Sequence, residues 1–178
     1  MRYFPKIIGE RIYLSPINAD DAEIYTKWLN DPAVADHLGQ YRNAITLATE
    51  KKALENMVSG GQNYAIVLKD GDELLGNISL MEVEHIHRRA TLGLFIGEAG
   101  RRGKGYGTEA IRLILGYGFN TLNLHNIMLT VHADNPQGLA CYKKVGFTEI
   151  GRRRGARIKD GKQIDLIYMD ILSTEFGG

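Results

Sequence analysis

The stretch Arg101-Arg102-Gly103-Lys104-Gly105-Tyr106-Gly107-Thr108-Glu109-Ala110 places three glycines within five positions and then continues into an apolar pattern of helical period. Glycine permits a turn with positive φ and lets a ligand approach the main chain closely. The first turn of the helix that follows offers unpaired backbone N–H groups and the positive end of the helix dipole. The stretch therefore predicts a site for a phosphate-bearing ligand, and a diphosphate fits it well.

The spacing of this stretch differs from the two commoner nucleotide loops. It contains no GxxxxGK[ST] pattern for a nucleoside triphosphate, and no acidic residue is suitably placed on a second strand for a dinucleotide ribose. The spacing Arg102-x-x-Gly105-x-Gly107 resembles the acetyl-coenzyme A signature R/Q-x-x-G-x-G/A of the GNAT N-acetyltransferases. A lone glycine loop is equally compatible with a tight turn that binds nothing, so the interpretation depends on a second motif.

That second motif is the segment NPQGLACYKKVGF at residues 135–147, which resembles the GNAT pattern N-x-x-(A/S)-x-x-x-Y-x-x-x-G-F. The two motifs in this order are more specific than either alone. The resemblance covers about residues 76–170 and is closest to the RimJ/RimL-type branch, within which EHIHRRA at residues 84–90 is similar to spermidine N-acetyltransferases. The first seventy residues match more loosely, through RIYL at 11–14 and WLND at 28–31.

Length and composition narrow the class of protein. A chain of 178 residues has the size of one domain, and roughly 70% of its unfolded surface can be buried, so we expect a single domain over residues 1–178. Lys and Arg number 22 and Asp and Glu 21, which favours neither nucleic acid nor a membrane as partner. The N-terminal MRYFPK lacks the apolar core of a signal peptide, and the single Cys141 excludes an internal disulfide framework. A cytoplasmic location is the simplest expectation.

Hydrophobic periodicity predicts a mixed α/β (α+β) chain. In the helix expected over residues 46–58, Leu47, Leu54, Met57 and Val58 form the apolar stripe. The resemblance implies a GNAT-type, mostly antiparallel sheet of six or seven strands flanked by about four helices. The expected helices are a segment capped by Asn18 and ended at Asp31, and residues 46–58, 108–121 and 136–145. The expected strands are residues 11–14, 64–68, 74–83, 90–96, 127–132 and 164–172, the last preceded by a hairpin turn at 160–161.

The resemblance also implies which residues hold acetyl-coenzyme A. Backbone N–H groups of residues 102–108 would bind the pyrophosphate, and the Arg102 and Lys104 side chains would either add charge or point to solvent. The strand before the loop would pair with the pantetheine arm, which Asn135 could also contact while it caps its helix. Five residues separate Ile96 from Arg102, where relatives often have four. The expected coenzyme-binding residues are Leu94, Phe95, Ile96, Arg102, Gly103, Lys104, Gly105, Tyr106, Gly107, Thr108 and Asn135.

Acyl transfer to an amine needs a proton donor for the leaving thiolate and an acceptor for the amine's proton. Tyr142 falls where the motif places the coenzyme's sulfur, and a phenol with a reference pKa near ~10 can donate a proton there; a packed core tyrosine is the alternative. Cys141 is expected on another helix face as a small buried hydrophobe. Glu82, Glu84, His85 and His87 are the candidate proton acceptors, with the two carboxylates on one strand face as the preferred pair, and a solvated strand end is the alternative.

The sequence therefore predicts an acetyl-coenzyme A-dependent N-acetyltransferase that moves the acetyl group directly to a primary amine, without a metal. A polyamine, a protein N-terminal amine and a small amine all remain open as acceptors, as does a homo-oligomeric assembly. A catalytically inactive coenzyme A-binding sensor or assembly module is the competing interpretation. The basic run Arg152, Arg153, Arg154 and Arg157 is expected to be a solvated strand face, with a coenzyme phosphate or an acidic substrate as the alternative.

Overall fold

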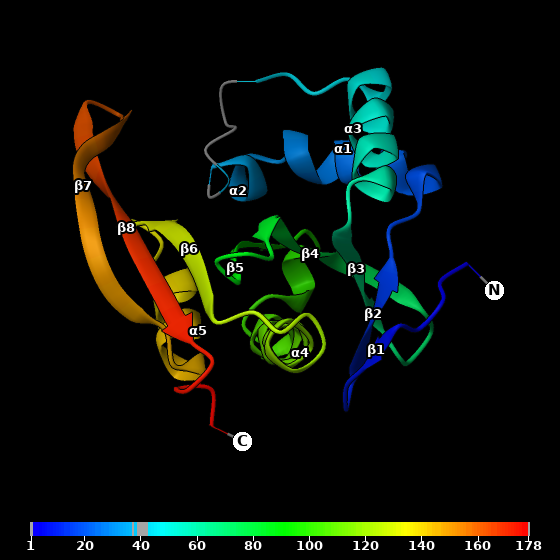
Figure 1. Ribbon diagram of the computed structural model, residues 1–178. Coiled ribbons are helices and arrows are strands. Elements are labelled where there is room, and N and C mark those ends of the chain that lie inside the picture. The colour runs from blue at the N-terminus through cyan, green and yellow to red at the C-terminus, as the bar shows by residue number, and fades with distance from the viewer. Residues whose placement is uncertain (1, 37, 39–42, 178) are drawn as a thin grey trace.

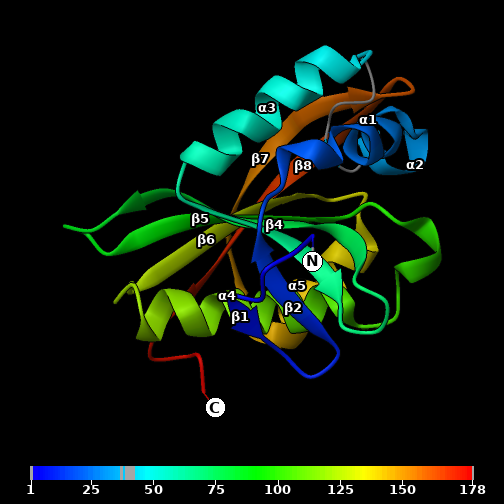
Figure 2. The same ribbon diagram turned by 90° about the vertical axis from the view of Figure 1, so that its right-hand side faces the viewer.

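A computed structural model describes residues 2–36, 38 and 43–177, which form an eight-stranded sheet with helices on both faces (Figures 1 and 2). Its strand order is β1-β2-β3-β4-β5-β6-β8-β7, and every neighbouring pair is antiparallel except β5 and β6. The strands are β1 (Ile7–Ile8), β2 (Ile12–Pro16), β3 (Gln62–Leu68), β4 (Glu73–Glu84), β5 (Arg89–Ile96), β6 (Asn126–His132), β7 (Thr148–Lys159) and β8 (Lys162–Leu172). The helices are α1 (Ala22–Asn30), α2 (Pro32–Ala35), α3 (Leu47–Ser59), α4 (Tyr106–Asn120) and α5 (Pro136–Val145), with short 3₁₀ turns at Ala19–Asp21 and Ala99–Arg101.

The period-two alternation of the central strands divides the core between the two faces of the sheet. Ile66 and Leu68 of β3 pack in the cluster that α4 and α5 cover, whereas Ala65 and Val67 pack in the cluster beneath α1 and α3. Figure 2 shows these helix layers, with α1, α2 and α3 on one side of the sheet and α4 and α5 on the other. Any ligand that reaches both layers must therefore pass through a gap in the sheet.

The predicted fold class is confirmed, with more elements than expected. The additional helix α2 begins where α1 was predicted to stop. Asp31 ends α1, yet its side chain also accepts a hydrogen bond from the Ala33 N–H at 2.9 Å, and Pro32 takes the first helical position. Proline at that position has its φ fixed for a helix and needs no N–H partner, so the Asp-Pro pair ends one helix and starts the next.

The apolar stripe predicted for α3 is only partly correct. Leu54 is fully buried and Met57 packs beside it, but Leu47 and Val58 are more than half exposed. Both exposed residues lie in the terminal turns of the helix, whereas the buried contacts come from its middle, at Glu50 and Leu54. In the described part of the chain, no helix is both long and apolar enough to cross a membrane.

Candidate active site

The parallel strands β5 and β6 pair over three residues and then separate. Their register joins Arg89 to Asn126, Ala90 to Ile127 and Thr91 to Met128, after which β5 continues to Ile96 without β6 as a partner. Along this free edge, side chains and backbone groups alternate in direction. Arg88 C=O faces β6 and Gly97 N–H donates to Leu75 C=O of β4 at 2.8 Å, so the alternation turns the N–H and C=O groups of Leu94 and Ile96 toward the gap.

The glycine loop follows this free edge and leads into α4. Gly103 and Gly105 have φ values of +72° and +86°, which only glycine adopts readily. Gly105 is the N-cap of α4, and no side chain of the described residues caps that helix end. The first-turn N–H groups at Tyr106, Gly107 and Thr108 therefore have no helical acceptor, and the helix dipole makes this end suited to an anion.

A pair of charged side chains holds the loop from behind. Glu109 accepts hydrogen bonds from the Arg11 N–H at 2.8 Å and from Arg11 Nε at 2.9 Å, and Arg11 Nη1 donates to the Lys104 carbonyl at 2.9 Å. The Arg11 guanidinium also lies over the Tyr106 ring, 4.8 Å from its centre. Although partial burial acts to raise the pKa of Glu109, the N–H groups of Arg11 and Ile12 and the guanidinium lower it. The start of β2 thus fixes the loop's conformation.

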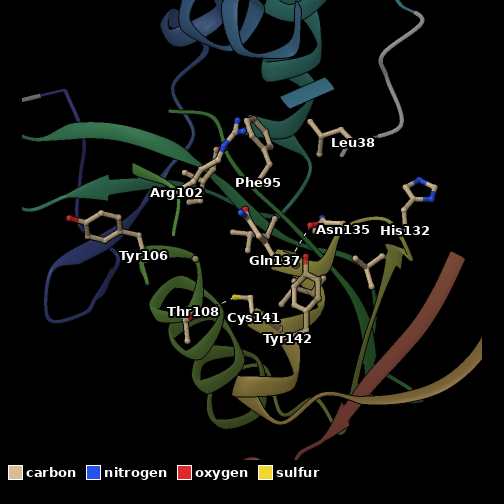
Figure 3. Close-up of a pocket in the computed structure, with 18 of the residues that line it drawn as sticks. Leu38, Phe95, Arg102, Tyr106, Thr108, His132, Asn135, Gln137, Cys141 and Tyr142 are labelled. Carbon is tan, nitrogen blue, oxygen red and sulfur yellow. Dashed lines mark hydrogen bonds between the residues drawn. The ribbon is translucent and has the colours of Figure 1, made fainter. Parts of the chain in front are cut away.

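A cavity of about 780 Å³ runs from the glycine loop through the gap between β5 and β6 (Figure 3). This volume suits a bound small molecule. Of the expected coenzyme-binding residues, all but Lys104 line the cavity, and Tyr142 lines it as well. Lys104 is exposed. The structure therefore brings the two sequence motifs, which are separated by about thirty residues in the chain, onto one site.

Tyr142 and its neighbours on α5 line the lower part of the cavity in Figure 3. Burial, and to a lesser extent Cys141, raises the pKa of Tyr142 to about 12, so its hydroxyl is protonated at neutral pH. Asn135 caps α5 by accepting the Gly138 N–H at 2.9 Å. Cys141 was expected on another helix face, but it is half-buried and lines the same cavity, with its Sγ 3.2 Å from Thr108 Oγ1. Cys141 reaches the cavity because α4 and α5 contact each other at Thr108 and Cys141.

Arg102 binds main-chain carbonyls in the structure. Its guanidinium donates to Ile96 O at 3.0 Å, Ala33 O at 3.1 Å and Gly97 O at 3.2 Å. These contacts join the end of β5 to α2 across the mouth of the gap. Gly97 lies against Trp28, where an added Cβ would come within 2.0 Å of the indole ring, so this approach of β5 to α1 requires glycine.

The structure places the predicted proton acceptors at the hairpin between β4 and β5, outside the cavity lining. The expectation that Glu82 and Glu84 share one strand face is wrong, because a bulge interrupts the pairing between Met81 and Glu84 and Glu82 has a φ of +52°. Glu82 accepts from Thr91 Oγ1 at 3.0 Å. The side chains of His85 and His87 are exposed near the hairpin tip.

Glu84 closes this hairpin turn. Its Oε1 accepts the Ile86 and His87 N–H groups at 2.7 and 3.1 Å. Although desolvation acts in the opposite direction, these two N–H groups, with the charges of His87 and Arg89, lower the pKa of Glu84. A lower pKa makes the carboxylate a weaker base. Whether Glu82 or Glu84 takes part in catalysis stays a prediction.

His132, at the end of β6, is a cavity residue that the sequence analysis did not single out. Its Nδ1 is buried and has no hydrogen-bond partner among the described residues. Burial, followed by the charge of Arg157, lowers the pKa of His132, while Asp134 and Asp36 act in the opposite direction. The imidazole is therefore neutral at pH 7. The sequence did offer one signal, since a histidine stands three residues before Asn135. Which way the His132 side chain points, however, depends on where β6 leaves β5.

The basic run on β7 has two different environments. Arg152, Arg153 and Arg154 are exposed, as expected for a solvated face, and Arg152 pairs with Glu149. Arg157 departs from that expectation, because its side chain is only 8% exposed and forms ion pairs with Asp36 and, at 3.7 Å, Asp134. Arg157 Nη1 also donates to Asp36 O at 2.7 Å, so this part of β7 is bound to the residue that follows α2.

A parallel strand pair that opens beside a glycine loop, with a tyrosine from a neighbouring helix lining the same cavity, is the combination that the two sequence motifs predict for an acyltransferase. The family model for the acetyltransferase (GNAT) domain matches residues 11–148. The chain belongs to the GNAT acetyltransferases and is an N-acetyltransferase. The match begins well before residue 76, so the weaker resemblance of the N-terminal part still reflects the family.

Three relatives illustrate the range of similarity. The N-acetyltransferase p20 of Bacillus licheniformis, itself uncharacterized, is 26% identical over 178 residues, or 95% of this chain and 97% of the relative. The putative ribosomal N-acetyltransferase YdaF of Bacillus subtilis is 30% identical over 85% of this chain and 80% of its own length. Spermidine N(1)-acetyltransferase of Escherichia coli K12 is 32% identical over 62% of this chain and 59% of its own length.

Solved structures share the fold at lower sequence identity. A GNAT-family acetyltransferase from Bacillus anthracis superposes with a TM-score of 0.82 at 24% identity, over 95% of this chain and 99% of that one. A spermidine N-acetyltransferase from Vibrio cholerae, solved with coenzyme A and spermine, gives a TM-score of 0.81 at 24% identity, over 93% and 98% of the two chains.

Proposed function

We propose that the protein transfers an acetyl group from acetyl-coenzyme A directly to a primary amine within the cavity described above. The observation that carries this proposal is the opening between β5 and β6, which places an unpaired strand edge, a glycine loop and Tyr142 on one cavity. The cavity passes from one helix layer toward the other, so two ligands can meet inside the sheet from opposite faces. That arrangement suits direct transfer within a ternary complex.

The residues present fit acetyl-coenzyme A, which supplies the acetyl thioester when it is bound. Gly103 and Gly105 form a cradle that side chains would fill, and the N–H groups that open α4 face an anion-binding position. The free edge offers the N–H and C=O groups of Leu94 and the N–H of Ile96 to an amide-bearing arm, while the Ile96 carbonyl already accepts from Arg102. The Vibrio cholerae relative solved with coenzyme A supports the same ligand class for this chain.

We assign Tyr142 Oη the role of proton donor to the departing sulfur. Its raised pKa keeps the proton on the hydroxyl until negative charge develops nearby. A thiol has a reference pKa near ~8.5, so full transfer from a phenol is uphill at equilibrium. The hydroxyl therefore acts chiefly through a hydrogen bond that strengthens as charge grows on sulfur, which lowers the barrier selectively.

His132 is our candidate for the group that takes the amine's proton, directly or through a water molecule. It lines the cavity, it is neutral at pH 7, and one of its ring nitrogens lacks a hydrogen-bond partner among the described residues. An amine with a reference pKa near ~10.4 arrives protonated and must lose a proton before its nitrogen can attack the thioester. A neutral base inside the site can accept that proton.

The test is a thiol-release assay with acetyl-coenzyme A and a panel of primary amines, run beside calorimetry of coenzyme A binding. We expect both binding and amine-dependent release. Binding without release for any amine would favour the alternative of an inactive coenzyme A sensor or assembly module. No binding of coenzyme A would contradict the assignment of the site itself.

A further inference from the structure

The cavity has a second end, remote from the glycine loop, which we call the acceptor chamber. Leu38, Phe95 and His132 lie on the opposite side of the cavity from Thr108 and Cys141 in Figure 3. The chamber collects side chains from α2, from Leu38, and from strands β4, β5, β6 and β8. Among the cavity-lining residues on these elements are Val34, Leu38, Met81, Phe95, His132 and Leu166, together with Thr91 and Thr130.

The chamber is apolar and lacks acidic groups. Apart from the hydroxyls of Thr91 and Thr130 and the neutral imidazole of His132, the chamber side chains named above are hydrophobic. Among the described residues, the lining of the whole cavity contains no Asp or Glu. The lining includes Arg102, Lys144 and Arg101, and the charge of Arg101 is paired with that of Glu73.

The carboxylates closest to the chamber are already engaged. Asp36 and Asp134 form ion pairs with Arg157 and Lys159. Although burial alone would raise the pKa of Asp36, its hydrogen bond to Lys159 and the charge of Arg157 lower it, as expected for a carboxylate stabilised by cations. This four-residue cluster is balanced in charge, so it gives little net attraction for another cation.

Glu82 is a further carboxylate near the cavity, because its hydrogen-bond partner Thr91 is a lining residue. It is exposed and accepts the Thr91 hydroxyl at 3.0 Å, on the edge of β5 next to the lining. A charge in this exposed position is screened by water and salt. It can steer a cation toward the mouth of the cavity, but it cannot compensate for the desolvation of an ammonium group beside Phe95 and Leu38.

We propose that the acceptor of this enzyme is a primary amine attached to an apolar group, with no second positive charge close to the reacting nitrogen. The proposal rests on the acetyl transfer proposed above and narrows its substrate class. One amine can lose its proton to a neutral base and react. A second ammonium on the same chain would have to stay charged in a chamber whose described lining offers no carboxylate, which is unfavourable.

Two amines of matched size test the proposal directly. Hexylamine and cadaverine have the same number of non-hydrogen atoms and differ in the far end of the chain, which is a methyl group in one and an ammonium in the other. We expect the wild-type protein to favour hexylamine by more than about tenfold in kcat/KM, since a site that must desolvate an uncompensated charge discriminates at this level or above. Spermidine serves as the longer polycation.

A designed carboxylate should reverse part of this preference. Met81 lines the chamber and is 44% exposed, so Met81→Glu can be accommodated without disturbing the core. We expect Met81→Glu to lower the hexylamine-to-cadaverine ratio by about three- to tenfold, as one added ionic contact allows. Met81→Gln controls for shape. Ile86→Glu, at a residue 87% exposed near the tip of the same hairpin, controls for net charge.

The outcomes separate this proposal from the one on which it depends. If wild-type protein acetylates cadaverine or spermidine as well as or better than hexylamine, the acceptor class is wrong while the acetyltransferase assignment stands. The same conclusion follows if Met81→Gln or Ile86→Glu changes the ratio as much as Met81→Glu does. If no amine releases thiol although coenzyme A binds, the proposed function fails, and the acceptor class fails with it.

Discussion

The two ends of the cavity are built in different ways. The coenzyme end comes from two short segments, β5 with the glycine loop and the first turns of α5, and it relies on main-chain geometry. The acceptor end draws single side chains from α2, β4, β6 and β8, and it relies on what those side chains are. Backbone geometry leaves compact spacing patterns in the sequence, whereas a chamber assembled from distant single residues leaves none.

The largest effect that we expect concerns Tyr142, which lines the cavity beside Cys141. Tyr142→Phe keeps the ring that packs against Phe147 but removes the hydroxyl proton. General-acid help is typically worth about 10²- to 10⁴-fold in rate, so kcat should fall within that range while coenzyme A affinity changes little. Pre-steady-state kinetics that resolve the chemical step provide the measurement.

Tyr168→Phe is the matched control for Tyr142, because Tyr168 is half-buried on β8 outside the cavity lining. Near-native chemistry in Tyr142→Phe would show that this tyrosine serves packing alone.

The next largest effect, about 10²-fold in kcat/KM near pH 7, is expected for His132→Gln at the acceptor end. Burial lowers the pKa of His132 below its ordinary value of about 6.5, so the imidazole is neutral above that pH. The kcat/KM of the wild-type protein should therefore be level from about pH 7 to 9. It should fall at acid pH, where the imidazole becomes protonated. The variant can use only amine that is already free, so its rate should rise about tenfold per pH unit from about pH 7 to 9.

His125→Gln, at an exposed histidine just before β6, should keep the wild-type profile. A His132→Gln profile that stays level from pH 7 to 9 would remove His132 from proton transfer.

A change in the glycine loop should affect binding at the coenzyme end. Gly105→Val places a branched side chain at φ +86°, with its Cβ 3.2 Å from an Arg11 guanidinium nitrogen. Strain of about 1–3 kcal/mol, together with loss of the close approach to the main chain, should weaken coenzyme A binding by about ten- to a hundredfold. Calorimetry measures it directly.

Gly161→Val carries the same backbone strain, at φ +75° in the β7–β8 turn, without touching the loop. Equal losses of coenzyme A affinity in the two valine variants would mean that general destabilisation, and not the cradle, is responsible.

The smallest effect is expected at the β4–β5 hairpin. Since neither Glu82 nor Glu84 lines the cavity, Glu82→Gln and the double change to Gln should alter kcat/KM by less than about fivefold, as for exposed charges. Steady-state kinetics with the best acceptor are sufficient. A large loss with an altered pH profile would restore the carboxylates as proton acceptors and displace His132.

The sequence predicted the coenzyme end of the cavity well and the acceptor end poorly. Gly105 predicted a loop before a helix, and Asn135 predicted a helix start. Both helices begin within two residues of the expected positions, because a positive φ and an N-cap are local requirements. The hairpin carboxylates were misplaced because a bulge at Glu82 changes which way each later side chain points. His132 was missed because its role depends on where β6 leaves β5, which is a property of the pairing and not of the strand's own residues.

The contact between Arg11 and Glu109 joins residues that are 98 positions apart. We expect a contact of such long range to form late in folding, because closing so long a loop costs entropy before the contact can repay it. The glycine loop therefore lacks its support until the N-terminal hairpin has docked beside α4. Coenzyme that binds only after this docking step shifts the folding equilibrium toward the fully folded protein. Partly folded forms gain no such stabilisation, so they stay sensitive to proteolysis.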